Sequence, residues 1–256
     1  MEIFDAIILG IVEGLTEFFP ISSTGHLILA SQLLHLPETE FLKTFQIVIQ
    51  LGAILAIVIL YWRKLFLDWE MMKRIMVALL PALGVGFVLY KLIRHLFESP
   101  LVVVIALFVG GVVLVLFEMF RKKEEGTGMA LDDMSYRTAF LVGLFQTLSV
   151  VPGVSRAGAT LLGGMLLGMK RTAIVEFSFL LAVPTMVAAT VLDVYKSGVY
   201  FSDGDFLLLL VGFVTAFVVA MVAVKFLLRF VETHTFIAFG VYRMIVAALF
   251  FLFVIL

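Results

Sequence analysis

The sequence predicts an all-α, polytopic membrane protein: an inverted-topology repeat with six full transmembrane helices and two re-entrant helix–loop–helix hairpins. Composition is the first reason, because 63% of the 256 residues are hydrophobic and only 14% are charged, which gives a mean hydropathy of +1.18. The second reason is six windows of about 20 apolar residues, each long enough to cross the core of a bilayer. The third is a pair of interrupted apolar segments that resemble each other.

Each predicted element occupies a definite part of the chain. The full spans are expected at residues 42–62, 71–94, 100–121, 173–195, 205–230 and 236–256. The interrupted segments cover residues 2–36, broken at PISSTG (20–25), and 134–169, broken at PGVSRAG (152–158). Irregular backbone at membrane depth must be shielded by protein or line a watery cavity, so these segments fit re-entrant hairpins better than spans.

The two interrupted segments match when one is shifted by 133 residues. The shift pairs Gly10 with Gly143, Glu13 with Gln146, Leu15 with Leu148, Thr16 with Ser149, Ser22 with Ser155 and Gly25 with Gly158. We therefore expect one integral membrane domain over 1–256, with a repeat at 1–121, a linker at 122–133 and a repeat at 134–256. A hairpin plus three spans crosses the membrane an odd number of times, so the second repeat is inverted and the site lies between broken helices.

Basic residues predict the orientation, because cytoplasmic loops are rich in Lys and Arg. Twelve lie in one set of loops: Arg63, Lys64, Lys73, Arg74, Arg121, Lys122, Lys123, Arg137, Lys170, Arg171, Lys225 and Arg229. Four lie in the opposite set: Lys43, Lys91, Arg94 and Lys196. The richer side is expected to be cytoplasmic, which places both termini and the base of the first hairpin on the outer side.

The composition also excludes several classes of function. A net charge of −1 argues against nucleic acid as a partner, which leaves membrane lipids as the expected surroundings. The absence of cysteine excludes disulfides, thiolate metal sites and thiol nucleophiles. The first 30 residues lack a basic start, and carboxylates interrupt their apolar run, so no cleavable signal peptide is expected.

Two carboxylates stand out in the first interrupted segment. Glu13 and Glu17 are four residues apart, so they share one helix face. Such a pair can hold a divalent cation, or it can polarise a neighbouring hydroxyl or imidazole. The alternative is a solvated pair on a surface helix, which the apolar residues on every side disfavour, since a charged group at membrane depth is costly.

The turn that follows holds a cluster of hydroxyls and an imidazole. Ser22, Ser23 and Thr24 could cap the helix that starts near Gly25. A helix N-terminus is also an anion site that favours phosphate. His26 lies three positions after Ser23, and a hydroxyl, an imidazole and a carboxylate together are typical of an activated nucleophile and its base.

The second interrupted segment contributes Arg156, flanked by glycines and Ser155. One interpretation is a snorkelling or ion-paired arginine; the other is an anion-binding turn in which the guanidinium grips phosphate. If the two hairpin tips meet, Arg156 faces Ser23 and His26. The whole constellation then indicates phosphoryl transfer.

Three polar residues in the predicted spans are less informative. Gln46 and Gln50 share a face of the first full span, and they either reach the site or form hydrogen bonds in the packing. Arg243 is expected to pair with Glu232 or with a carboxylate of the site.

Two motifs resemble those of a known family. The pair Glu13-x-x-x-Glu17 followed by FFPISSTGH (18–26) resembles the first signature of bacterial undecaprenyl-diphosphate phosphatases of the BacA type, and PGVSRAGAT (152–160) resembles the second. The resemblance covers nearly the whole chain in length, span order and motif placement. It implies an enzyme of the bacterial cytoplasmic membrane, open to the outer side, that dephosphorylates undecaprenyl diphosphate, recycles the peptidoglycan lipid carrier and counters bacitracin.

The resemblance also implies residue roles and a cofactor. Glu13 and Glu17 match the essential carboxylate pair, which would hold a divalent cation, Mg²⁺ or Ca²⁺. By position, Ser23 matches the nucleophile, His26 the catalytic histidine and Arg156 the phosphate-binding arginine. Either Ser23 or His26 could accept the phosphoryl group, and Ser23 is favoured. The remaining expected substrate contacts are Ser22, Thr24, Ser155, Thr160 and Gln50.

One residue departs from the family pattern, and two other functions compete. Ala157 stands where the family often has serine, so that hydroxyl is dispensable or is replaced by Thr160 or Ser155. A lipid-phosphate transporter or flippase could use the same inverted-repeat site without a nucleophile. A membrane scaffold would tolerate changes at all of these positions. The sequence also leaves a homodimer open.

Overall fold

The computed structural model describes residues 1–89, 96, 99–121, 128–197 and 204–255, and within these ranges the regular structure is helical. A single parallel bridge, between Met129 and Met169, is the exception. The end of the span predicted at 71–94, the first half of the predicted linker, and the basic residues Lys91, Arg94, Lys122 and Lys123 lie outside the described residues.

The helices follow the predicted order. They are α1 (Ile3–Thr16), α2 (Ser23–Leu33), α3 (Glu40–Phe66), α4 (Trp69–Val88), α6 (Pro100–Phe120), α7 (Tyr136–Gln146), α8 (Arg156–Leu166), α9 (Arg171–Ser197), α10 (Phe206–Thr233) and α11 (Ile237–Phe250). A short 3₁₀-helix, η1 (Thr147–Val150), follows α7, and a π-helical turn, η2 (Phe251–Ile255), follows α11.

Five helices among the described residues are long and apolar enough to cross a membrane: α3, α4, α6, α9 and α10. The all-helical, multi-pass class predicted from the sequence is therefore confirmed. The sixth predicted span, at 236–256, is a shorter apolar helix over Ile237–Phe253 that includes part of the π-helical turn.

Side chains at the predicted boundaries start several of these helices. The hydroxyl of Thr39 accepts a hydrogen bond from the Leu42 amide before α3, and Asp68 accepts one from the Met71 amide before α4. Each side chain satisfies a backbone donor that the first helical turn leaves free. Pro100 begins α6, where its missing N–H costs nothing.

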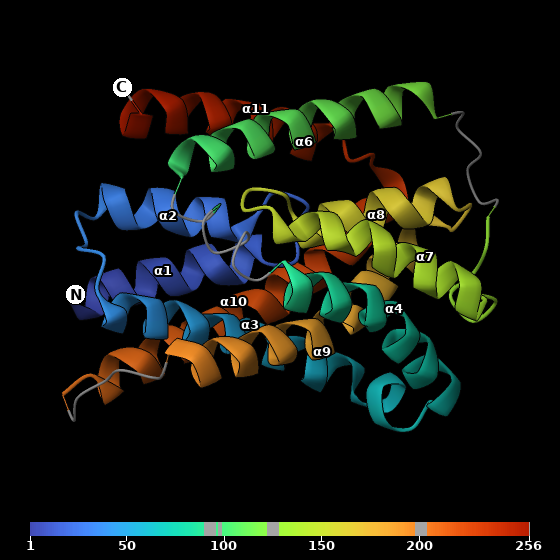
Figure 1. The fold of residues 1–256 in the computed structure, drawn as a ribbon, viewed down its shortest axis with the longest axis horizontal. Coiled ribbons are helices and arrows are strands. Elements are labelled where there is room, and N and C mark those ends of the chain that lie inside the picture. The colour runs from blue at the N-terminus through green and yellow to red at the C-terminus, as the bar shows by residue number, and fades with distance from the viewer. Residues whose placement is uncertain (90–95, 97–98, 122–127, 198–203, 256) are drawn as a thin grey trace.

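The two hairpins have the same local plan. The 133-residue offset maps the start of α1 onto the start of α7, and both bounds of α2 onto those of α8. Each connecting turn contains one residue with positive φ, Ser22 at 70° and Gly153 at 90°. In Figure 1, α1 and α2 lie toward one end of the long axis, α7 and α8 lie toward the other, and their turns face each other near the centre.

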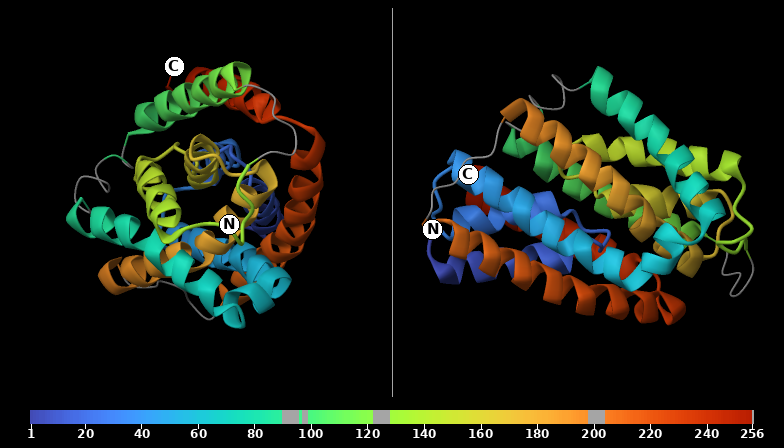
Figure 2. Two further views of the ribbon diagram at one scale, coloured as in Figure 1. Left: turned by 90° about the vertical axis from the view of Figure 1, so that its right-hand side faces the viewer. Right: turned by 90° about the horizontal axis from the view of Figure 1, so that it is seen from below.

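Glycines pack each hairpin against a long helix of the opposite half. A Cβ at Gly14 of α1 would lie 2.6 Å from the Ala216 carbonyl oxygen of α10, and one at Gly143 of α7 would lie 2.0 Å from that of Ala78 of α4. Such close approach is available only to glycine. The two halves therefore interlock, and Figure 2 shows the short helices surrounded by the long ones.

Candidate active site between the two hairpin turns

The carboxylate of Glu17 joins the two hairpins. Its Oε2 accepts a hydrogen bond of 2.6 Å from the Ser23 hydroxyl, and its Oε1 lies 3.3 Å from Nη2 of Arg156. The side chains of Arg156 and Glu17 are only 9% and 4% exposed. Glu17 is the C-cap residue that follows α1, Ser23 begins α2 and Arg156 begins α8, so helix ends supply all three groups. The structure thus brings together the residues that the two sequence motifs singled out.

Glu13 lies one helical turn before Glu17 and is fully buried. Among the residues that the structure describes, neither of its carboxylate oxygens has a hydrogen-bond partner, although Glu17 and Arg156 are near enough to interact electrostatically. A buried carboxylate without a partner is costly, so this one requires a proton or a cation. Glu13 is the clearest unmet acceptor in the site.

A divalent cation fits these donors. The described part of the chain has no group of three or more His, Cys, Asp or Glu side chains that could form a complete cage. Mg²⁺ is commonly held by one or two carboxylates, with water and substrate phosphates completing its shell. The free oxygens of Glu13, with Glu17 beside them, match that pattern.

His26 has two partners, and Ser23 is neither of them. Its Nδ1 lies 2.8 Å from the Ser22 carbonyl oxygen, and its Nε2 lies 2.9 Å from the Tyr242 hydroxyl. Because a carbonyl oxygen only accepts, Nδ1 carries the proton of the neutral ring and the tyrosine donates to Nε2. The rings of His26 and Tyr242 are nearly parallel, at 5°. In this arrangement Glu17, and not the expected histidine, contacts the Ser23 hydroxyl.

The Arg156 guanidinium is only partly satisfied by the protein. Its Nη1 donates to the Ser178 carbonyl oxygen at 3.0 Å, and Nη2 contacts Glu17. Its Nε is buried, with no hydrogen-bond partner in the part of the chain that the structure describes. A buried arginine with an unused donor is suited to grip a phosphate oxygen.

Other predicted substrate contacts support the turns from within the protein. Ser155 accepts a hydrogen bond from the Gly158 amide at 3.1 Å, and its hydroxyl lies 3.4 Å from the Phe19 carbonyl oxygen. The Thr160 and Ser178 hydroxyls lie 2.6 Å apart. Their geometry indicates a role in shaping the Arg156 turn. Ser22 is buried, Thr24 and Gln50 are half-buried, and Ala157 is 1% exposed.

Two residues of the last helix were missed or misassigned from the sequence. Tyr242 carried no signal, because a tyrosine in an apolar helix is ordinary. Arg243 was expected to pair with Glu232 or a site carboxylate, and that expectation is wrong: within the described residues its four hydrogen bonds end on backbone carbonyl oxygens, while Glu232 is exposed.

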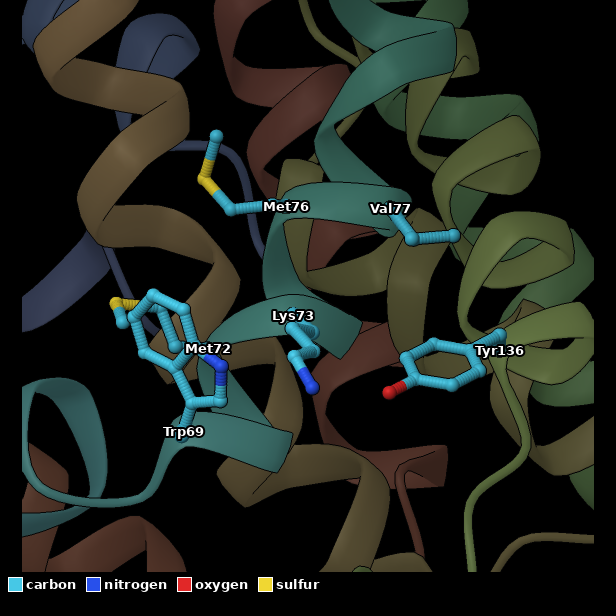
Figure 3. A pocket seen from close by; sticks show the side chains of 6 residues that line it. All are labelled: Trp69, Met72, Lys73, Met76, Val77 and Tyr136. Carbon is cyan, nitrogen blue, oxygen red and sulfur yellow. The ribbon is translucent and has the colours of Figure 1, made fainter.

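A separate surface pocket of about 520 Å³ lies at the start of α4 and α7. Figure 3 shows its lining, which includes none of the site residues: Trp69, Met72, Lys73, Met76, Val77 and Tyr136. Glu70 pairs with Lys73 at 2.8 Å and also accepts the Tyr136 hydroxyl. Lys73 and Tyr136 therefore share Glu70 as their partner.

These features define the class of the protein: a multi-pass helical membrane protein with a hydroxyl–carboxylate–arginine site where two broken hairpins meet. Residues 6–249 match the family model described as Bacitracin resistance protein BacA. The chain belongs to that family.

Full-length relatives agree with this assignment, and each of the following is named undecaprenyl-diphosphatase. The chain is 52% identical to one from Sulfurihydrogenibium sp. (strain YO3AOP1), over 98% of this chain and 99% of the relative. It is 50% identical to one from Persephonella marina, over 99% and 100%. It is 47% identical to one from Aquifex aeolicus, again over 99% and 100%.

Proposed function

We propose that this chain hydrolyses undecaprenyl diphosphate to undecaprenyl phosphate and inorganic phosphate. The relatives named undecaprenyl-diphosphatase support this substrate. The observation on which the proposed chemistry depends is the Ser23 hydroxyl held by Glu17 beside Arg156. A nucleophile, an adjacent base and a guanidinium at membrane depth are the groups that cleavage of a lipid-borne phosphate requires.

The first step is attack by Ser23 on the terminal phosphorus. Glu17 takes the hydroxyl proton as the new O–P bond forms, and the bond from phosphorus to the bridging oxygen breaks. Undecaprenyl phosphate leaves with the electron pair of that bond. Arg156 neutralises charge on the transferring group through the donors that the protein leaves free.

The second step returns the enzyme to its starting state. Water attacks the phosphoserine, inorganic phosphate departs, and Ser23 recovers its proton from Glu17. His26 accepts from Tyr242 and donates to the Ser22 carbonyl oxygen, so in this proposal it holds the turn that carries Ser23. A divalent cation bound by Glu13 and Glu17 would supply further neutralisation of phosphate charge.

The proposal includes a membrane arrangement. α1–α2 and α7–α8 are re-entrant hairpins that enter from opposite sides, and six spans surround them. The excess of Lys and Arg near the α3–α4 turn and the start of α9 supports a cytoplasmic position for that end. The site then opens to the outer side of the bacterial cytoplasmic membrane, where hydrolysis recycles the lipid carrier for peptidoglycan synthesis.

Release of inorganic phosphate from C55 diphosphate by the purified protein tests this function. The rival function, transport of a lipid phosphate, needs the anion-binding arginine but no nucleophile. Ser23→Ala therefore separates the two: it abolishes phosphate release by a hydrolase, whereas a transporter keeps moving a labelled lipid phosphate across liposomes. Wild-type protein that releases no phosphate would exclude the hydrolase.

A further inference from the structure

Arg243 binds both hairpin turns at once. From the middle of α11, its Nη1 donates to the Pro20 carbonyl oxygen at 3.1 Å and its Nη2 donates to that of Gly153 at 3.1 Å. The same guanidinium donates to two carbonyl oxygens of α6, those of Ala106 at 3.1 Å and Leu107 at 3.2 Å. One side chain therefore connects α11, α6 and the two turns.

The two turn carbonyls occupy equivalent places. Pro20 and Gly153 are related by the same 133-residue offset that relates the hairpins. Pro20 lies three residues before Ser23, and Gly153 lies three residues before Arg156. The arginine therefore contacts each half of the site at the same distance along the chain from its functional residue.

The Arg243 guanidinium is buried, and removing a charged group from water costs free energy. Its residue is 2% exposed, and each hydrogen bond that the structure gives it ends on an uncharged carbonyl oxygen. Burying a charge without an opposite charge costs stability, so the geometry that this arginine imposes explains its presence better than stabilisation does. The planar fork of an arginine can reach several carbonyls in fixed directions, which a lysine cannot.

The neighbouring helix is shaped around this guanidinium. A Cβ at Gly110 of α6 would lie 2.1 Å from Nη2 of Arg243. A Cβ at Gly111 would lie 2.7 Å from the Gly240 carbonyl oxygen of α11. The first glycine makes room for the guanidinium, and the second brings the two helices close enough for it to reach the turns.

We propose that Arg243 is a positioning residue that fixes the two hairpin turns relative to each other and so holds Arg156 opposite Ser23. Its effect on activity rests on the proposed hydrolysis. The effect on the spacing of the hairpins does not, and the two can be measured separately.

Three variants and one control test the effect on activity. Arg243→Met removes the guanidinium that binds both turns. Arg243→Lys keeps the positive charge but cannot reach the same carbonyl oxygens. Gly110→Ala keeps the arginine but places a methyl group where its guanidinium lies. Gly84→Ala is the control, because a Cβ there meets nothing within 4 Å. A displacement of about 1 Å between reacting groups can lower the rate about 100-fold. We therefore expect kcat/KM for C55 diphosphate to fall about 100-fold in Arg243→Met and Gly110→Ala. It should fall less in Arg243→Lys and stay unchanged in Gly84→Ala.

Spin-label distances report the positioning directly. The chain contains no cysteine, so Leu33→Cys and Leu166→Cys, at the exposed ends of α2 and α8, give one label on each hairpin. We expect a narrow distance distribution in the otherwise unchanged protein and in Gly84→Ala, and a broadened or shifted one in Arg243→Met and Gly110→Ala.

Two results would overturn the proposal. One is wild-type kcat/KM in either Arg243→Met or Gly110→Ala. The other is loss of activity with an unchanged distance distribution, which would show that the arginine acts in some way other than positioning. If the wild-type protein releases no phosphate, the hydrolysis proposal fails, and the spin-label distances still decide whether Arg243 holds the hairpins together.

Discussion

The Ser23 hydroxyl donates a 2.6 Å hydrogen bond to the Glu17 carboxylate, across the turn that links the first two helices. Both residues are buried, so the bond forms where little water competes for it. A serine held by a carboxylate has a place for its proton when it attacks. This geometry supports the proposed role of Glu17 as the base for Ser23.

Removing either partner should abolish most of the activity. Ser23→Ala deletes the nucleophile, and we expect phosphate release to fall by at least about a thousandfold. Glu17→Gln keeps the shape but cannot take the proton, so a loss of about 10²–10⁴-fold is expected. Steady-state phosphate release from C55 diphosphate in detergent measures both effects.

A matched serine provides the control for these variants. Ser149 lies near the turn of the second hairpin, and its hydroxyl donates to the Gln146 carbonyl oxygen of its own turn. Ser149→Ala should retain full activity. Equal activity in Ser23→Ala and the wild type would remove serine from the mechanism and move attention to His26 as the phosphoryl acceptor.

Arg156 should resist even a conservative replacement. Arg156→Lys retains a positive charge but loses the fork that spans Glu17 and the Ser178 carbonyl oxygen. We expect kcat/KM to fall about 100-fold, because an oriented charge donor is lost. Arg137→Lys, at an exposed position, is the control. A lysine variant with wild-type kcat/KM would show that charge alone suffices.

Glu13 should govern the dependence on a divalent cation. Its carboxylate has no hydrogen-bond partner in the described part of the chain, so Glu13→Gln should raise the Mg²⁺ concentration needed for half-maximal activity. Titration of EDTA-treated protein with Mg²⁺ measures this. Glu40→Gln alters an exposed carboxylate and should leave the titration unchanged. An unaltered Mg²⁺ requirement in Glu13→Gln would exclude Glu13 as a ligand.

The sequence predicts most of the fold because hydrophobic length and polar interruptions are local signals. The five long apolar helices and the two interrupted segments follow from such patterns, and the bounds of α3, α6, α9 and α10 lie within four residues of the predicted ones. The internal repeat with its offset of 133 residues is also detectable in the sequence. Its paired glycines, Gly10 and Gly143, each allow a short helix to pack closely against the backbone of a long one.

Contacts made by ordinary residues across long sequence distances could not be predicted. Tyr242 reaches His26 over 216 positions, and neither the tyrosine nor its helix differs from a lipid-facing segment. Arg243 stands out in the sequence because it is a charged residue in a predicted span. Such a charge suggests a carboxylate partner, and sequence patterns do not reveal that its partners are backbone carbonyl oxygens. The sequence also could not show that the Ser23 hydroxyl bonds to Glu17, because the spacing of two residues along the chain does not determine the directions of their side chains.

The Tyr242 hydroxyl should act through His26. Tyr242→Phe keeps the stacked ring and removes one hydrogen bond, so we expect a loss of about tenfold in kcat. Because His26→Gln already removes the group that this hydroxyl orients, adding Tyr242→Phe to it should cost little more. Tyr195→Phe, at a residue that is 85% exposed, is the control. Multiplicative losses in the double variant would mean that the tyrosine acts independently.

A buried ion pair that joins three helices should affect stability more than an exposed one. Glu118, with its side chain 2% exposed, lies 2.8 Å from Arg171 and accepts the Phe236 amide, joining α6, α9 and the start of α11. Glu118→Gln should cost about 3 kcal/mol because it strands a partly buried arginine. Glu40→Gln breaks the exposed pair with Lys43 and should cost about 0–1 kcal/mol. Thermal unfolding in detergent compares the two variants. Equal shifts in melting temperature would show that the buried pair contributes no more to stability than the exposed one.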